Sequence, residues 1–167
     1  MSLKTFSRKL AVFSDADCPY CQRLEKQELS NITDVTIYTF LYPIAQLHPD
    51  AANKSKYIWC DSDRAKAWQN WMLYSLLPAK SGSCDTPIAK NNELANKLSV
   101  TSTPTLFFAD GKRILGAQTY KDIERALGAA PAYSQASTAA AELPDDPQVF
   151  GRSASPNSTK AKGKKKK

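Results

Sequence analysis

Two cysteines three positions apart are the residues of this sequence best suited to chemistry. Cys18 and Cys21 stand in the stretch SDADCPYCQRL, residues 14–24, directly after an apolar run and directly before a segment rich in helix formers. The thiolate is the reactive form of cysteine, so a useful cysteine needs a pKa lowered toward neutrality. The N-terminus of a helix supplies this, because unpaired N–H groups and the macrodipole favour a negative charge there.

The spacing of the pair predicts a division of labour between the two thiols. Cys18 is expected where a strand ends and a helix begins, with Pro19 at the first helical position, which proline favours. Cys21 follows one turn later, on the same side of the helix and within reach of the first sulfur. The sequence therefore predicts an exposed attacking thiol and a partly sheltered resolving thiol, as thiol–disulfide exchange requires.

The residues around the pair modify this expectation. Asp15 and Asp17 carry negative charge and oppose formation of a thiolate at Cys18. Tyr20, between the cysteines, offers only an O–H donor, so we expect a less depressed pKa than in a pair that encloses a histidine. His48, in the stretch LHPD, is the only histidine of the chain and is interpreted as a loop residue rather than a catalytic base.

Two other interpretations of the pair are weaker. A zinc site normally adds a second C-x-x-C or closely spaced cysteine and histidine ligands. Here the other two cysteines, Cys60 and Cys84, lie 24 positions apart. A purely structural bridge between Cys18 and Cys21 closes too small a loop to add much stability. We therefore expect a redox-active pair that uses no metal and no cofactor.

The elements that must position the cysteines follow from local patterns. They are a strand over 10–14, a helix from the cysteines to about 29, a strand over 34–42, helices over about 50–59, 62–77 and 89–98, a hairpin over 103–116 and a last helix over 120–127. The β-α-β order places the first two strands parallel, and the hairpin adds an antiparallel pair. The predicted fold is α/β, a mixed sheet of about four strands with flanking helices, which resembles the thioredoxin fold with a helical insertion at about 50–98.

One segment of the predicted insertion carries a helical stripe. Trp68, Trp71, Met72 and Leu76 recur at helical spacing. The two tryptophans are interpreted as core and groove lining rather than as part of a cofactor site.

A proline near the predicted hairpin is the second chemical signal. In this architecture the strand that enters the hairpin, within the stretch TSTPTLFF, passes beside the cysteines. A cis Thr103–Pro104 bond places the backbone of Thr103 opposite Cys18, where it is available to an extended substrate segment. An ordinary trans proline at the start of a strand is the alternative.

Charge and composition divide the chain in two. Residues 151–167 hold Arg152 and six lysines but no acid, so the other 16 basic residues balance all 16 acids. The net charge of +7 thus belongs to the tail, and no nucleic-acid partner is expected for the domain. We predict one catalytic domain over 1–128 and a disordered, Lys-rich tail over 129–167. No apolar run is long enough to span a membrane or to form the core of a signal peptide.

Four segments carry a resemblance to a known family. FSDADCPYCQRL, IWCDSDRAKAW, SGSCDTPI and VTSTPTLFFADGKRILG together resemble the catalytic domain of the DsbC/DsbG family of periplasmic thiol:disulfide interchange proteins. The resemblance covers about residues 8–127. It implies that Cys18 is the nucleophile, that Cys21 is the resolving thiol and that Thr103–Pro104 form a cis-proline loop.

The resemblance also bears on the second cysteine pair. Cys60 and Cys84 match a structural disulfide of the DsbC branch; free buried thiols or a second redox pair are the alternatives. An even number of cysteines agrees with an oxidising compartment, and the resemblance implies the periplasm. The Pro19-Tyr20 dipeptide is more like the DsbG branch, so the branch stays open.

The function implied by the resemblance is disulfide isomerisation or oxidoreduction on protein substrates, with Tyr20, Thr103 and Pro104 as substrate-binding residues. A membrane or periplasmic thiol reductant is the expected redox partner. Family members carry an N-terminal dimerisation domain, whereas about nine residues precede the first predicted strand here. We expect a monomer for this chain and a dimer if such a domain lies upstream. A chaperone-like polypeptide-binding module is the alternative function.

Overall fold

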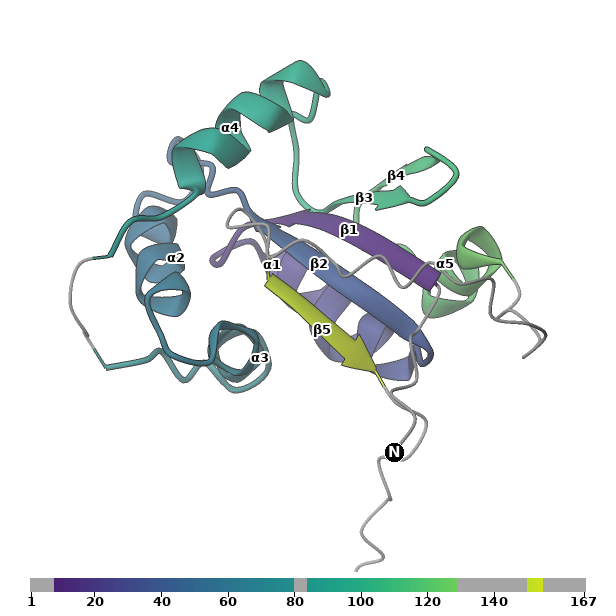
Figure 1. Ribbon diagram of the computed structural model, residues 1–167, viewed down its shortest axis with the longest axis horizontal. Coiled ribbons are helices and arrows are strands. Elements are labelled where there is room, and N and C mark those ends of the chain that lie inside the picture. The colour runs from purple at the N-terminus through teal and green to yellow at the C-terminus, as the bar shows by residue number, and fades with distance from the viewer. Residues whose placement is uncertain (1–7, 80–83, 129–149, 155–167) are drawn as a thin grey trace, which may run out of the picture.

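A five-stranded mixed sheet forms the centre of the molecule, in the order β4-β3-β1-β2-β5 (Figure 1). The computed structural model describes residues 8–79, 84–128 and 150–154. The strands are β1 (Arg8–Ser14), β2 (Val35–Leu41), β3 (Thr105–Phe108), β4 (Arg113–Leu115) and β5 (Phe150–Ala154). β1 and β2 are parallel, and the other neighbouring pairs are antiparallel. The parallel first pair and the hairpin predicted from the sequence are confirmed.

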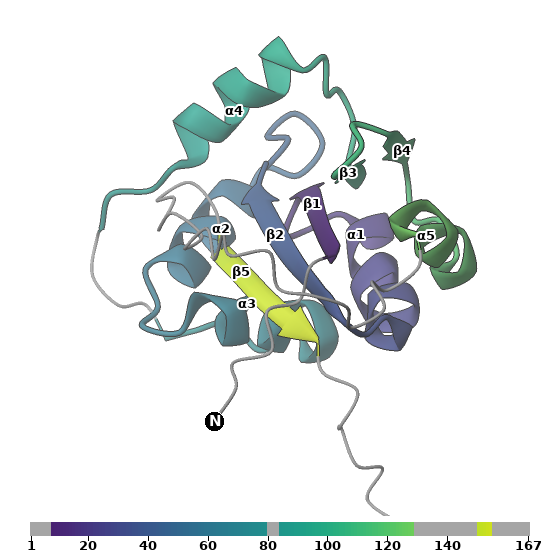
Figure 2. The same cartoon turned by 45° about the vertical axis from the view of Figure 1, so that its right-hand side comes forward.

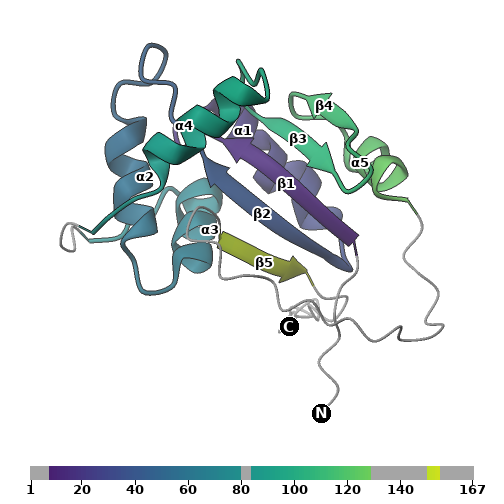
Figure 3. The ribbon, with the colours of Figure 1, turned by 45° about the horizontal axis from the view of Figure 1, so that its top comes forward.

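Helices cover both faces of this sheet. They are α1 (Pro19–Arg23), continued by helical turns over Leu24–Glu28 and Leu29–Asn31, then α2 (Ala51–Trp59), α3 (Arg64–Tyr74), α4 (Ile88–Lys97) and α5 (Tyr120–Leu127). α1 lies behind the sheet and α4 in front of it, while α2 and α3 stand near the end of β2 (Figure 3). Among the described residues, no helix has the length and apolar character needed to cross a membrane.

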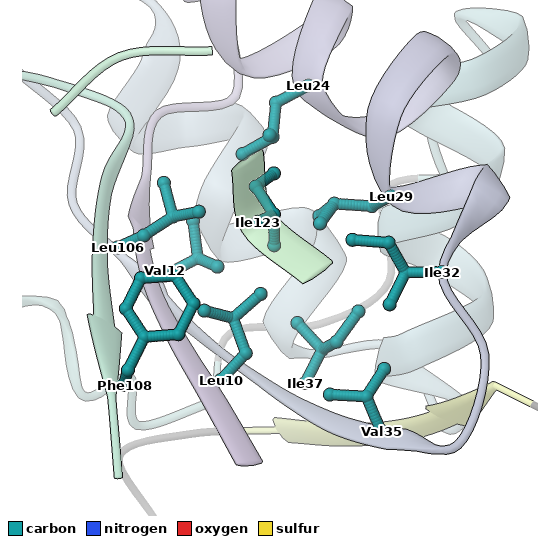
Figure 4. Close-up of a cluster of buried hydrophobic side chains, with 10 residues drawn as sticks. All are labelled: Leu10, Val12, Leu24, Leu29, Ile32, Val35, Ile37, Leu106, Phe108 and Ile123. Atoms are coloured by element: carbon teal, nitrogen blue, oxygen red, sulfur yellow. The ribbon is translucent and has the colours of Figure 1, made fainter. Parts of the chain in front are cut away.

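The alternation of side chains along β1 builds a core on each face of the sheet. Leu10 and Val12 point to the face covered by α1 and α5, where they pack with Leu24 and Ile123 (Figure 4). All four side chains are essentially inaccessible to solvent. This cluster fixes the helix that follows the cysteines against the sheet.

The opposite face of β1 is aromatic. Phe13 stacks on Phe40 of β2 with ring centroids 4.8 Å apart, and it packs in a cluster with Ala95 of α4 and with Val100. Figure 2 shows α4 set apart from α1 and α5 by the sheet. The helical segment inserted between β2 and β3 therefore supplies the cover of this face.

The third helix ends three residues earlier than the sequence predicts. α3 stops at Tyr74 because Ser75 adopts a left-handed conformation with φ 56°. Trp68 and Met72 are buried as predicted, but Leu76 lies outside the helix and is 60% exposed. The helical stripe therefore extends over fewer residues than the spacing suggested.

The tail contributes a strand that composition did not reveal. β5 pairs antiparallel with β2, with Phe150 opposite Thr39 and Ala154 opposite Val35. The prediction of a disordered tail is therefore wrong for Phe150–Ala154; residues 129–149 and 155–167 lie outside the described residues. The pairing uses the main-chain N–H and C=O groups of an open sheet edge. A strand of almost any sequence can form hydrogen bonds with such an edge, so composition gives little sign of it.

Truncation of the chain after Gly128 tests the contribution of β5. The truncated protein loses the strand that covers the outer edge of β2, so we expect its melting temperature to fall by about 3 °C, equivalent to ~1 kcal/mol. Thiol-exchange activity should be unchanged, because β5 pairs with residues 35–39 of β2, whereas the cysteine pair lies at the start of α1. The matched control ends after Ala154 and retains β5. Equal melting temperatures of the two truncated proteins, measured by circular dichroism, would contradict a stabilising role.

Candidate active site

Cys18 lies at the junction between the loop after β1 and the start of α1. It is the residue that caps the helix, with φ −74° and ψ 120°, and Pro19 opens the helix as predicted. The N–H of Cys18 donates to the Asp15 carbonyl at 3.2 Å, and its carbonyl accepts from the N–H of Gln22 at 3.0 Å. The thiol is therefore held at the amino end of the helix, where a thiolate is favoured.

Both thiols of the pair are free, and both are buried. Cys18 is 4% exposed and Cys21 is inaccessible. They belong to a hydrophobic cluster with residues of α2 and α3 that include Ile58, Trp59 and Trp68. The prediction of an exposed attacking thiol is therefore wrong, because the helical insertion packs against the pair. The exposed fractions of the two thiols differ little, whereas their pKa values differ greatly.

The two thiols have opposite pKa shifts. A hydrogen bond from the Cys21 side chain is the largest influence on Cys18 and lowers its pKa from 9.0 to about 5. Burial opposes this shift, whereas the Thr103 side chain and the backbone N–H groups of Cys21 and Tyr20 add to it. Burial is the largest influence on Cys21 and raises its pKa strongly, and the neighbouring Cys18 raises it further. Near neutral pH, Cys18 is a thiolate and Cys21 is a thiol.

The Thr103–Pro104 peptide bond is cis, as expected for this loop. The Thr103 carbonyl lies 3.5 Å from the Cys18 sulfur and accepts its hydrogen bond when the thiol is protonated. Pro104 is buried, while Tyr20 is 61% exposed. The structure thus brings together Cys18 and the loop that the sequence singled out for substrate binding.

Cys60 and Cys84 form a disulfide, with their Cα atoms 5.7 Å apart. The bond joins the end of α2 to the segment that precedes α4. The pairing implied by the family resemblance is confirmed, and neither sulfur is free for exchange with the Cys18–Cys21 pair.

Removal of this disulfide should destabilise the protein without stopping its chemistry. Replacing both Cys60 and Cys84 by alanine releases a loop of about 25 residues, which is worth roughly 3 kcal/mol in the chain-entropy model. We expect a melting temperature about 10 °C lower and most of the insulin reductase activity retained. Thermal unfolding and insulin turbidity measure the two effects. A folded variant as inactive as Cys18→Ser would show instead that the disulfide takes part in exchange.

Sequence reasoning missed the partners of the acids that precede the pair. Asp15 is fully buried; its Oδ2 accepts from the Ile44 N–H at 2.8 Å and lies 3.0 Å from Nδ1 of His48. Its Oδ1 accepts from the N–H of Asp17 at 2.8 Å, and its own N–H donates to the Cys21 sulfur at 3.4 Å. His48 is a loop residue as predicted, but it helps to hold the segment that leads into the cysteine pair.

The next two residues are held by the helical insertion. Lys54 of α2 pairs with Asp17, with Nζ and Oδ1 2.7 Å apart. The indole N–H of Trp71 in α3 donates to the Ala16 carbonyl at 2.6 Å. The only signal of these contacts in the sequence is a pair of acids beside Cys18, and their partners lie tens of positions away.

Comparison with known proteins agrees with this geometry. Residues 3–131 match the family model of the thioredoxin-like domain. A crystal structure of a disulfide interchange protein from Neisseria gonorrhoeae is 45% identical, with a TM-score of 0.68, and the match covers 72% of this chain and 85% of that one. The chain belongs to the thioredoxin-like disulfide interchange proteins.

Curated members of this family carry the name DsbC. The probable thiol:disulfide interchange protein DsbC of Bordetella parapertussis is 41% identical over 72% of this chain and 42% of the relative. The thiol:disulfide interchange protein DsbC of Escherichia coli is 33% identical over 71% of this chain and 50% of the relative. The chain therefore spans half or less of the length of these two relatives.

Proposed function

We propose that this chain catalyses thiol–disulfide interchange on protein substrates, as an isomerase or oxidoreductase, through Cys18-Pro19-Tyr20-Cys21. The observation that supports this most is the opposite ionisation of the two sulfurs. The pKa of Cys18 is lowered to about 5, and the pKa of Cys21 is raised by burial. A nucleophile and a protonated reserve thiol thus lie one helical turn apart. The names of the curated relatives support the same chemistry.

The first step is attack of the Cys18 thiolate on one sulfur of a substrate disulfide. The substrate S–S bond breaks, a bond between Cys18 and the substrate forms, and the other substrate sulfur leaves as a thiolate that takes a proton from solvent. The low pKa of Cys18 keeps it ionised for attack and also makes it a good leaving group in the reverse direction. A mixed disulfide that forms and breaks readily suits an interchange enzyme.

The mixed disulfide has two ways to resolve. In isomerisation, a thiolate of the substrate attacks the substrate sulfur bound to Cys18 and frees the Cys18 thiolate, so no net electrons are transferred. In reduction, Cys21 loses its proton and attacks the Cys18 sulfur. The Cys18–Cys21 disulfide forms, the substrate leaves reduced, and a thiol reductant must then restore the enzyme dithiol.

Substrate recognition is proposed for the loop beside the nucleophile. Thr103 lies within hydrogen-bonding distance of Cys18, so an extended substrate segment that pairs with the Thr103 backbone would present its disulfide to the thiolate. Pro104 has no N–H and adds no competing donor at this point. The exposed ring of Tyr20 offers apolar contact on the helix side.

The cellular setting is part of the same proposal. A native Cys60–Cys84 disulfide suits an oxidising compartment, and we propose the periplasm, with a membrane-bound or periplasmic thiol reductant as partner. The monomeric state expected for this chain stays a prediction.

Equilibrium redox titration tests the proposed function. The purified chain is incubated in glutathione buffers, and the Cys18–Cys21 disulfide is quantified by trapping and mass spectrometry. We expect a reversible two-electron transition of this pair alone, together with reduction of insulin by the wild-type chain. A pair that does not oxidise reversibly, in a chain that only suppresses aggregation of unfolded protein, would instead support the polypeptide-binding module.

A further inference from the structure

The helical insertion reaches the residue that precedes the nucleophile. Lys54, on α2, lies with Nζ 2.7 Å from Oδ1 of Asp17, which is adjacent in sequence to Cys18. The same ammonium group lies 5.0 Å from the ring centroid of Trp71. Trp71 in turn donates its indole N–H to the carbonyl of Ala16. A cation and an indole ring from the insertion therefore hold two consecutive residues immediately before Cys18.

The ion pair is sheltered on both sides. The Lys54 side chain is 22% exposed and that of Asp17 is 19% exposed. The hydrogen bond with Asp17 is the largest influence on the pKa of Lys54 and raises it. Asp50, at the start of α2, adds a second carboxylate 3.6 Å from Nζ. Lys54 is consequently a cation over the whole range in which the Cys18 thiol ionises.

The other acid of this segment faces a different element. Asp15 is satisfied by the Ile44 N–H and by Nδ1 of His48, which both belong to the loop after β2. Each of the two carboxylates before Cys18 thus has its own partner. Without a partner, the Asp17 carboxylate would repel the thiolate formed at the next residue, since like charges disfavour ionisation.

We propose that Lys54 is a positioning residue for thiol exchange, which pairs with Asp17 and removes the repulsion that this carboxylate would exert on the Cys18 thiolate. This inference rests on the proposed function for its relevance. Its test needs no substrate, so its failure is distinguishable from failure of the proposed function. The helical insertion then has two roles at the active site: it packs against the cysteine pair, and it supplies the cation that neutralises Asp17.

The experiment measures the Cys18 pKa from thiolate absorbance at 240 nm in the reduced protein. Lys54→Met keeps an apolar side chain over Trp71 but loses the charge, and we expect it to raise the Cys18 pKa by about one unit. The same variant should shift its redox equilibrium with glutathione about tenfold toward the disulfide, because the reduced form loses thiolate stabilisation. Asp17→Asn should lower the Cys18 pKa, since the repelling group is gone and the cation remains.

Three further variants make the result specific. Lys54→Met combined with Asp17→Asn should return the Cys18 pKa to within about 0.3 unit of wild type, since both charges are absent. Lys54→Arg keeps the charge and should match wild type. Lys56→Met removes a charge from the same helix, away from Asp17, and should leave the pKa unchanged. An unchanged pKa in Lys54→Met, an equal rise in Lys54→Arg or in Lys56→Met, or no reversal in the double variant would overturn the proposal.

Discussion

Replacing Cys18 by serine is expected to lower insulin reduction by at least about 1000-fold, to the level without enzyme. A serine hydroxyl does not ionise near neutral pH and forms no bond to a substrate disulfide that Cys21 could resolve. The substitution keeps the size of the side chain, so the buried cluster around it should remain folded. The double alanine variant of Cys60 and Cys84 is the control that removes two cysteines without touching the pair.

Replacing Cys21 by alanine should separate attack from resolution. In this variant the lowered pKa of Cys18 loses its largest cause, the hydrogen bond from Cys21, but Thr103 and the helix end remain. Attack continues, no second thiol is available within the protein, and the mixed disulfide with substrate accumulates at Cys18. Non-reducing electrophoresis and peptide mapping identify the linkage. Capture of substrate at Cys21 in the Cys18→Ser variant instead would reverse the roles of the two residues.

The parallel pair of strands could be predicted because local signals specify it. β2 is a continuous β-branched and aromatic run, and a helix between two strands leaves only a right-handed crossover. The start of α1 was predicted for a similar reason, because Pro19 is favoured at the first position of a helix and disfavoured inside one. Such features depend on a few neighbouring residues, which a single sequence displays in full.

The exposure of Cys18 could not be predicted in this way. The cluster that covers it comes from α2 and α3, about forty to fifty positions further along the chain, and includes Ile58 and Trp68. The local sequence pattern predicts that a thiol lies at the end of a helix, but it does not predict which residues pack over that end. The pairing of Cys60 with Cys84 is similar, since it rests on family resemblance and not on spacing.

The effect of charged side chains on the Cys18 thiolate could not be predicted from local sequence either. From the sequence alone, Asp15 and Asp17 are two negative charges without known partners, and they are expected to oppose a thiolate at Cys18. In the fold, Asp17 pairs with Lys54, 37 positions away, and Asp15 lies beside His48, 33 positions away. The sign of an electrostatic effect at a site therefore depends on the tertiary partners of each charge, and these partners are set by the helical insertion and by the loop after β2.

Alkylation of Cys18 is expected to proceed at an almost constant rate between about pH 6 and pH 8, and to slow about tenfold per pH unit well below pH 5. The reason is that alkylation consumes the thiolate. A pKa lowered to about 5 keeps Cys18 ionised throughout the neutral range. Only when the pH falls through this value does protonation remove the nucleophile. The rate is measured with iodoacetamide on the reduced protein, followed by peptide mapping.

Cys21 should behave in the opposite way under the same conditions. Its pKa is raised by burial and by the charge on Cys18, so it stays protonated over the whole range and should react at least about 100-fold more slowly than Cys18 at pH 7. The reduced chain in guanidinium chloride is the matched control. Unfolding removes both shifts, so both cysteines should then react at similar rates that rise about tenfold per unit up to pH 8. A folded protein in which Cys18 shows the same rise between pH 6 and pH 8, or in which Cys21 is labelled first, would contradict the division of roles on which the proposed mechanism depends.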